Sequence, residues 1–311
     1  MNSIRSALPR RDFLAGMGAF GATLAAGNTI HAAETAPAGK RTICVFSKHL
    51  QFLDYDRMAE AAAEIGFEGV DLTVRPGGHV LPENVERDLP KAVKAVKAAG
   101  LTAPMMATAV TDPADPLTER VLKTAADNGI SYYRLGYYEY DETRPIPDVL
   151  DEHRRKVEGL AELNAGLGLH GGYQNHAGTG VGSPVWDLWH ILRGLDPRWV
   201  GVNYDIRHAT AEGGNSWVLG LKLISTYIKG IVIKDFKWAL IDGKWVIYDV
   251  PVGEGMVDFR RYFKLLGGYG FPGLITTHFE YKLEETLEST GSAMRADLRA
   301  LKSLLAEAGL G

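Results

Sequence analysis

The chain has 311 residues, of which 46% are hydrophobic and 23% are charged, and its formal net charge is −4. These values are ordinary for a globular protein of enzyme size, and without a Lys- and Arg-rich stripe a nucleic-acid partner lacks its electrostatic footprint. Cys44 is the single cysteine, which excludes intramolecular disulfides and cysteine-rich metal sites.

Residues 1–33 have the order of an export signal. Arg10 and Arg11 open a twin-arginine signature, an apolar run from Phe13 to Ala26 follows, and small residues come before position 34. The apolar run is too short and too rich in glycine for a stable membrane span. We therefore expect a twin-arginine signal peptide over 1–33, a linker over 34–41 and a periplasmic or otherwise exported protein. An uncleaved anchor is the alternative.

From Thr42 onward, short β-branched runs alternate with amphipathic helical stretches. The first strand is predicted at 42–46, and the first helix at 55–65 ends at Gly66, a typical C-cap glycine. The other predicted strands lie at 69–73, 102–107, 132–135, 169–174, 200–205, 228–234 and 274–277. The other predicted helices lie at 91–99, 117–128, 147–167, 184–195, 217–224, 258–266 and 283–308.

Eight strands in strict alternation with eight helices predict an α/β fold, a single-domain (β/α)8 TIM barrel over 42–311. An open doubly wound sheet is the alternative, but no Gly-rich phosphate turn follows an early strand. After the seventh strand, Asp242-Gly243 between apolar runs predicts a small β-hairpin over 238–248.

Polar side chains follow most of the predicted strands. Because the carboxyl ends of barrel strands meet at one mouth, we expect these side chains to converge on one pocket. Gln174 and His176 stand at the fifth strand, where Gly171 and Gly172 are expected to let the chain pass close to a ligand. The expected substrate-binding side chains are Arg75, His79, Glu139, His208 and Trp238.

Each of these residues has a structural alternative. Arg75 precedes Pro76-Gly77-Gly78 and is equally consistent with a solvated turn. Lys234 and Asp235 are adjacent on a strand and so are expected to point in opposite directions. Imidazole and carboxylate groups suit zinc, manganese or similar ions, but the chain has no compact metal motif such as H-E-x-x-H.

Five segments in the same order resemble the sugar phosphate isomerase/epimerase family of xylose isomerase-like barrels. Together they span nearly all of 42–308: Gly66–Leu72, Gln174–His176, Tyr204–Ala209, Ile233–Asp235 and Gly253–Phe259. The resemblance implies a barrel that holds one divalent ion with Glu, Asp, His and Glu from strands 5 to 8. It also implies that the two glutamates act as an acid–base pair.

Carried onto this chain, the four ligand positions fall on Gln174, Asp205, Val232 and His278, so that only the aspartate is retained. A rebuilt site would use Asp205, Gln174, His278 and Glu280 as metal ligands, with manganese, zinc, magnesium or cobalt as the ion. Lys234, His278 and His176 are then the expected catalytic groups, since a neutral Gln cannot take a proton.

Two hypotheses follow from these patterns. The first is an exported enzyme that acts on a sugar or polyol by proton abstraction next to a carbonyl, in isomerisation, epimerisation or β-elimination. The second is a carbohydrate-binding barrel without catalysis, favoured by the lost ligands. A small-molecule sugar is the expected partner in both, nucleic acid and stable membrane insertion are not expected, and a homo-oligomer is left open.

Overall fold

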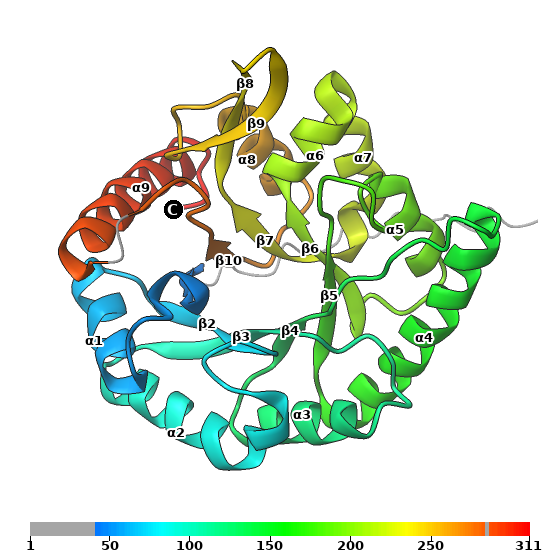
Figure 1. Cartoon of the computed structure of the whole chain (residues 1–311), viewed down its shortest axis with the longest axis horizontal. Coiled ribbons are helices and arrows are strands. Elements are labelled where there is room, and N and C mark those ends of the chain that lie inside the picture. Colours follow the sequence, from blue (N-terminus) through cyan, green and yellow to red (C-terminus); the bar gives the residue numbers. More distant parts are fainter. Residues whose placement is uncertain (1–40, 284–285) are drawn as a thin grey trace, which may run out of the picture. The chain divides into compact units, whose positions relative to one another are not determined.

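Eight parallel strands close into a barrel in the computed structural model, which describes residues 41–283 and 286–311 (Figure 1). The strand order around the barrel is β1-β10-β7-β6-β5-β4-β3-β2. This order confirms the predicted (β/α)8 barrel. The predicted signal peptide and residues 34–40 of the predicted linker lie outside the described residues.

The barrel strands coincide with the predicted ones to within a residue or two. They are β1 (Thr42–Phe46), β2 (Gly69–Val74), β3 (Thr102–Thr108), β4 (Tyr132–Arg134), β5 (His170–Gln174), β6 (Val200–Asp205), β7 (Ile228–Ile233) and β10 (Leu274–Thr277). Every pair of neighbours is parallel, and the register shifts only within the β2–β3 and β6–β7 pairs.

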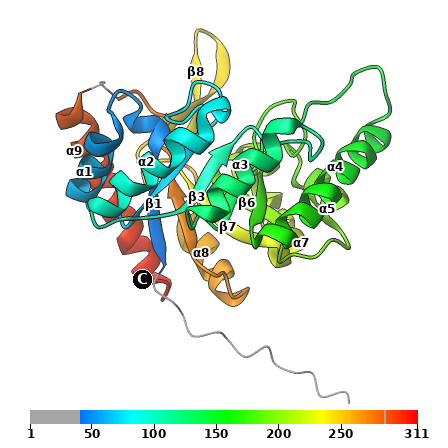
Figure 2. The same cartoon turned by 90° about the horizontal axis from the view of Figure 1, so that it is seen from below.

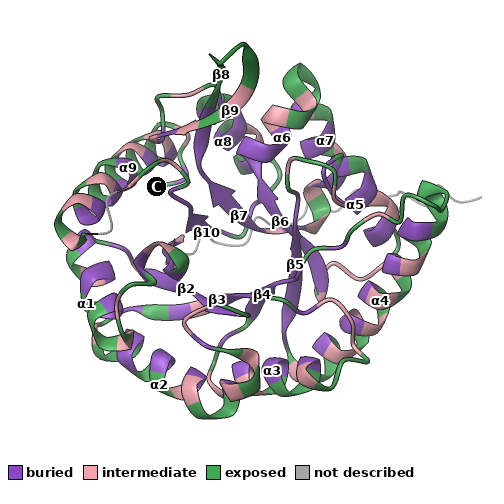
Figure 3. Ribbon diagram, in the orientation of Figure 1, coloured by how far each residue is buried: buried purple, intermediate pink, exposed green. Residues whose placement is uncertain are grey.

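Helices surround the strands, with their buried faces toward the barrel and their exposed faces outward (Figure 3). The predicted helices are present as α1 (Tyr55–Ile65), α2 (Val85–Ala98), α3 (Pro116–Asp127), α4 (Ile146–Leu167), α5 (Val185–Leu192), α7 (Trp217–Ile224), α8 (Phe259–Gly268) and α9 (Leu287–Glu307). Gly66 caps α1 with a φ of 104°, a conformation that favours glycine.

Two helical segments differ from the prediction. Helix α2 begins at Val85 and not at Lys91, because Pro90 lies inside the helix and does not start it. Helix α6 (Ile206–Gly213) was not predicted. It follows β6 without a connecting loop and runs into Gly213-Gly214, so its eight residues lack both a separate turn signal and a long apolar period.

The predicted hairpin is present as β8 (Asp235–Ile241) and β9 (Lys244–Val250), paired antiparallel. Asp242 and Gly243 form its turn with φ values of 50° and 76°, as a two-residue turn with both central residues left-handed requires. Figure 2 shows the hairpin projecting from one end of the barrel, while the C-terminus lies toward the other end.

Glycines in β5 make room for aromatic side chains on both faces of the sheet, since Tyr132 packs inside the barrel with Cys44 and Met105 and Tyr133 faces Asn164 of α4. A Cβ atom on Gly172 would lie 1.8 Å from the hydroxyl oxygen of Tyr132, and one on Gly171 would lie 2.8 Å from that of Tyr133. The expectation that these two glycines approach a ligand is therefore wrong: they accommodate tyrosines of β4.

Among the described residues, no helix is both long and apolar enough to cross a membrane.

Candidate functional site at the barrel mouth

A pocket of about 120 Å³ opens at the carboxyl ends of the barrel strands. Its lining comes from β1, β2, β4, β5, β7 and β10 and the residues that follow them: Phe46, Lys48, Arg75, Arg134, Tyr137, Gln174, His176, Lys234, His278 and Glu280. A larger hollow lies on the outer surface between α2 and α3, but ion-paired and exposed side chains line it, Glu86 with Arg120 among them. The mouth pocket is the site where buried ionisable groups converge.

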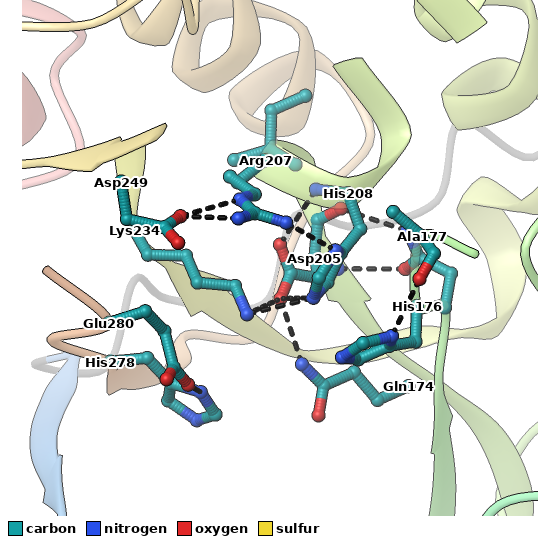
Figure 4. Close-up of polar contacts among 12 residues, drawn as sticks. Gln174, His176, Ala177, Asp205, Arg207, His208, Lys234, Asp249, His278 and Glu280 are labelled. Atoms are coloured by element: carbon teal, nitrogen blue, oxygen red, sulfur yellow. Dashed lines mark hydrogen bonds and ion pairs between the residues drawn. The ribbon is translucent and has the colours of Figure 1, made fainter. Parts of the chain in front are cut away.

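Asp205, His208 and Lys234 form the centre of this site (Figure 4). Lys234 Nζ lies 3.2 Å from Asp205 Oδ2 and 2.8 Å from His208 Nε2. All three residues are buried, with relative exposures of 4% or less. A buried ion pair of this kind keeps its strength because water does not screen it.

The local sequence fixes Asp205 in place. It ends β6 and also caps α6, since its Oδ1 accepts a hydrogen bond of 3.1 Å from the backbone N–H of His208. The side chain of Asn175, directly after β5, holds the Asp205 backbone, with one hydrogen bond to its carbonyl (2.9 Å) and one from its N–H (2.8 Å). Asp205 is therefore held from two strands before any ligand binds.

His208 is a neutral imidazole in this setting. Burial lowers its pKa well below the ordinary value, and the charge of Lys234 lowers it further. Arg207, which is ion-paired with Asp249 of β9, has its Nη1 3.0 Å from His208 Nδ1. A neutral ring has one acceptor nitrogen, so only one of the two flanking cations, Arg207 at Nδ1 or Lys234 at Nε2, donates a hydrogen bond to it.

Gln174 connects this centre to a second group of polar residues. Its Nε2 donates to Asp205 Oδ2 at 2.8 Å, and its Oε1 accepts from Arg134 Nη1 at 3.2 Å and from the Tyr137 hydroxyl at 3.0 Å. The amide is thereby oriented, with its oxygen turned away from Asp205.

His278 and Glu280 occupy the β10 side of the pocket. His278 Nδ1 lies 3.7 Å from Glu280 Oε1, and Glu280 Oε2 lies 3.1 Å from Lys48 Nζ. The His278 ring stacks on Phe46 with centroids 4.3 Å apart, and burial lowers its pKa to about 3. His278 is therefore uncharged at neutral pH.

The structure brings most of the predicted site residues to this mouth. Arg75, Gln174, His176, Lys234, His278 and Glu280 line the pocket, and Asp205 and His208 lie directly behind Lys234. The His176 ring is 4.0 Å from the His208 ring.

Besides His208, three predicted substrate-binding residues are not part of the lining. His79 turns toward Ser47, to which its Nδ1 lies at 3.2 Å, because the β2–α2 loop folds back on β1. Glu139 is exposed after β4, and Trp238 is 41% exposed on the hairpin. The strand ends aim side chains inward, whereas residues farther along the loops lie outside the mouth.

The most informative residue that the sequence analysis missed is Arg134, the last residue of β4. It is 5% exposed, its Nη1 donates to Tyr137 and Gln174, and its guanidinium lies 4.9 Å from the centre of the Tyr137 ring. The feature of the sequence that could have indicated it is an arginine inside the otherwise apolar and aromatic run 132–135. A buried arginine in a strand is rare unless it is paired or used.

The four residues expected to bind a metal do not form a suitable set of ligands. Gln174 presents its N–H to Asp205, and position 232 holds valine. Lys234 puts a cation against the one retained carboxylate, while His278 and Glu280 contact each other and Lys48. Within the described residues, no cluster of three His, Cys, Asp or Glu side chains could hold an ion. The geometry therefore supports no step through a metal.

Sequence comparison places this barrel among known proteins. The model of the xylose isomerase-like TIM barrel matches residues 59–304. The chain belongs to this family. This matches the resemblance seen in its sequence motifs.

Curated relatives include inosose dehydratases. Those of Bacillus licheniformis and Klebsiella pneumoniae are each 30% identical, over 148 and 147 residues, which is 42% of this chain in both cases. The matched part spans about half the length of these relatives, 47% and 48%.

Solved structures share the fold over most of their length. A xylose isomerase domain protein from Planctomyces limnophilus has a TM-score of 0.65 at 17% identity, with 88% of this chain and 99% of that chain covered. A 3-keto-D-glucoside 4-epimerase from E. coli has a TM-score of 0.63 at 16% identity, with 85% and 100% covered. A barrel from Mycobacterium smegmatis in complex with magnesium has a TM-score of 0.64 at 15% identity, with 86% and 99% covered.

Proposed function

We propose that this chain is an enzyme that modifies a sugar or polyol by moving a proton on a carbon next to a carbonyl. The observation that carries the proposal is the buried Asp205–His208–Lys234 cluster, whose lysine opens onto the mouth pocket. The relatives named as inosose dehydratase and the structure named as a keto-glucoside epimerase support this class of substrate. Isomerisation, epimerisation and β-elimination share the enolate-like intermediate that such a site would stabilise.

The pocket residues suit different roles in this chemistry. Lys234 is held by Asp205 and His208 and would donate a hydrogen bond to the carbonyl oxygen, where negative charge develops as the proton leaves. His278 is a weak base because its pKa is about 3, so it suits hydrogen-bond donation from a neutral ring. His176 is exposed at the rim and is left as the base that takes the proton from carbon.

The proton balance of this step is simple. His176 takes a proton from the carbon, and the electron pair moves to the carbonyl oxygen that Lys234 contacts. Return of a proton to the opposite face of the same carbon gives epimerisation. In isomerisation the proton goes to the former carbonyl carbon, while the hydroxyl on the deprotonated carbon gives up its proton to the former carbonyl oxygen and becomes the new carbonyl. Loss of a β-hydroxyl as water gives elimination.

The experiment that tests this proposal is proton exchange with deuterated water, followed by NMR. Inososes, ketohexoses and 3-keto-glycosides form the panel of substrates. We expect exchange next to the carbonyl with at least one class and a loss of about 100-fold or more in Lys234→Met and His176→Asn. His190→Asn is the matched control, because His190 pairs with Asp151 on the outer surface. Full exchange in Lys234→Met would refute the assigned role.

The second candidate function is sugar binding without catalysis. It is favoured by the neutral residues at two family ligand positions, Gln174 and Val232. Sugar binding in the absence of proton exchange across the whole panel would select it.

The predicted divalent ion and the predicted export route each have a separate test. Elemental analysis of the purified protein tests for manganese, zinc, magnesium or cobalt, and cell fractionation tests for export. The ligand geometry favours a protein purified without a bound ion.

A further inference from the structure

The mouth pocket carries more positive than negative charge. Four cations line it, Lys48, Arg75, Arg134 and Lys234, whereas the lining holds one carboxylate, Glu280. Lys234 is neutralised by Asp205, and Lys48 by Glu280. Within residues 41–283 and 286–311, neither arginine has a carboxylate within ion-pair distance.

Arg134 is the most unusual of these cations. It is almost completely buried, and among the described residues it bonds only to neutral groups on Tyr137 and Gln174, while its Nε–H has no acceptor there. A buried charge without a counter-ion is costly, so such residues are retained mostly where they bind something. Asp71 lies deeper in the barrel and bonds to Thr276, and burial raises its pKa to about 7. Near neutral pH it therefore supplies Arg134 with only part of a negative charge.

Arg75 approaches the pocket from the end of β2. Its guanidinium lies 5.5 Å from the centre of the Phe46 ring, and its pKa is lowered by desolvation and then by the charge of Arg134. Two guanidinium groups that repel each other across one pocket form a site for a group with two or more anionic oxygens. Planar guanidinium groups bind carboxylate and phosphate through parallel hydrogen bonds.

We propose that Arg134 and Arg75 bind an anionic group of the substrate, a carboxylate or a phosphate, so that the substrate is an acidic sugar derivative. This inference rests on the function proposed above, because it names the substrate class for the same pocket. Lys234 would then face the reacting carbonyl while the two arginines hold the charged end of the molecule.

Binding of three matched hexoses tests the proposal without any need for turnover. The probes are glucose, glucuronate and glucose 6-phosphate, which differ at carbon 6 alone, and affinity is measured by calorimetry on the full chain. We expect at least one anion to bind about tenfold or more tightly than glucose, with added salt weakening it. The comparison between the two anions shows whether the group is a carboxylate or a phosphate.

Variants assign the anion to its residues. Arg134→Met should weaken binding of the preferred anion by about tenfold or more, and Arg75→Met by less, because Arg75 is half-exposed. Arg134→Lys keeps the charge but loses the planar fork, so an intermediate loss is expected from a folded protein. Arg260→Met is the control, since this exposed arginine pairs with Glu307 far from the pocket.

Two results overturn the inference: equal binding of glucose and both anions, or unchanged anion affinity in Arg134→Met. Failure of all three probes and of inorganic phosphate to bind at millimolar concentration overturns it as well. Anion binding without proton exchange on keto sugars, both neutral ones and ones that carry the preferred anion, would sustain this inference and refute the proposed function. Proton exchange on neutral sugars without anion binding would support the proposed function and overturn this inference.

Discussion

Asp71 offers the sharpest test of the electrostatics beneath the pocket. The residue lies on β2 and is 1% exposed. Within the part of the chain that the structure describes, it accepts one hydrogen bond, from Thr276 Oγ1 at 3.0 Å, and its Oδ1 has no partner. Burial raises its pKa from the ordinary 3.8 to about 7, although Thr276 and the charges of Arg134 and Arg75 act in the opposite direction. We expect Asp71→Asn to stabilise the protein at neutral pH.

The sign of the effect follows from where the proton binds more tightly. The folded state holds the Asp71 proton up to about pH 7, whereas the unfolded chain releases it near pH 3.8. Below about pH 4 Asp71 is protonated in both states, so its titration does not lower the free energy of unfolding. As the pH rises toward 7, only the folded state must keep the proton or accept a buried charge, so stability is lost in this window. The pKa of Asp71 is higher by about 3 in the folded state than in the unfolded chain, which corresponds to about 4 kcal/mol of lost stability at pH 8.

Urea unfolding of the natural chain and of Asp71→Asn over a series of pH values measures this difference. We expect the variant's advantage to grow by up to about 4 kcal/mol between pH 4 and pH 8. If the new amide N–H changes the free energy of unfolding by the same amount at every pH, the dependence of the difference on pH is unaffected. Thr276→Val is the companion variant, and because it removes the bond that favours the ionised form, it should move the transition to higher pH.

The opposite result would refute the reasoning. If Asp71→Asn lost stability as the pH rose, Asp71 would be ionised in the fold and would serve as the counter-ion of Arg134. Arg134 would then be neutralised inside the barrel, and the argument for an anionic substrate would lose its main support.

Three further predictions concern Gln174, Asp235 and Gly255. Gln174→Glu should weaken binding of the preferred anion by about tenfold or more in calorimetry, because its carboxylate would stand where Gln174 Oε1 now lies 3.2 Å from Arg134 Nη1 and would neutralise that arginine; unchanged anion affinity would contradict this. Asp235→Asn should cost about 2–4 kcal/mol in urea unfolding, because the carboxylate accepts four backbone N–H groups at the base of the hairpin; no loss would contradict this role. Gly255→Ala should destabilise strongly because its Cβ would lie 2.2 Å from Asp235 Oδ1, whereas Gly268→Ala has open space and serves as the control.

The barrel could be predicted because its signals are local and repeated. Most strands are short runs of β-branched, apolar or aromatic residues, and each long helix has an apolar period. The hairpin turn is fixed by Asp242-Gly243. Helix α6 escaped because it starts inside the motif that ends β6, where Asp205 is both the last strand residue and the helix cap. A residue with two structural roles leaves no separate signal for the second one.

The site was predictable only in part, because direction and pairing depend on tertiary structure. Lys234 and His278 could be placed from strand ends, but the turn of His79 toward Ser47 depends on how a loop folds back on β1. Arg134 was hidden inside a predicted strand, where the pattern gives no indication of which face is the mouth. Its missing counter-ion is a property of the assembled barrel and of no single segment.

Gln174 and Arg134 are best understood together. In a barrel with glutamate at position 174, the carboxylate would lie within hydrogen-bond distance of Arg134 and would neutralise it, as Gln174 Oε1 now lies 3.2 Å from Nη1. A neutral amide keeps the hydrogen bond and leaves the charge of the guanidinium available to a ligand. The same substitution lets Lys234 approach Asp205 without a second carboxylate to bind. Compared with the ligand set that the family resemblance implies, an amide at position 174 would favour an anion over a cation at this mouth, as the proposed acidic substrate requires.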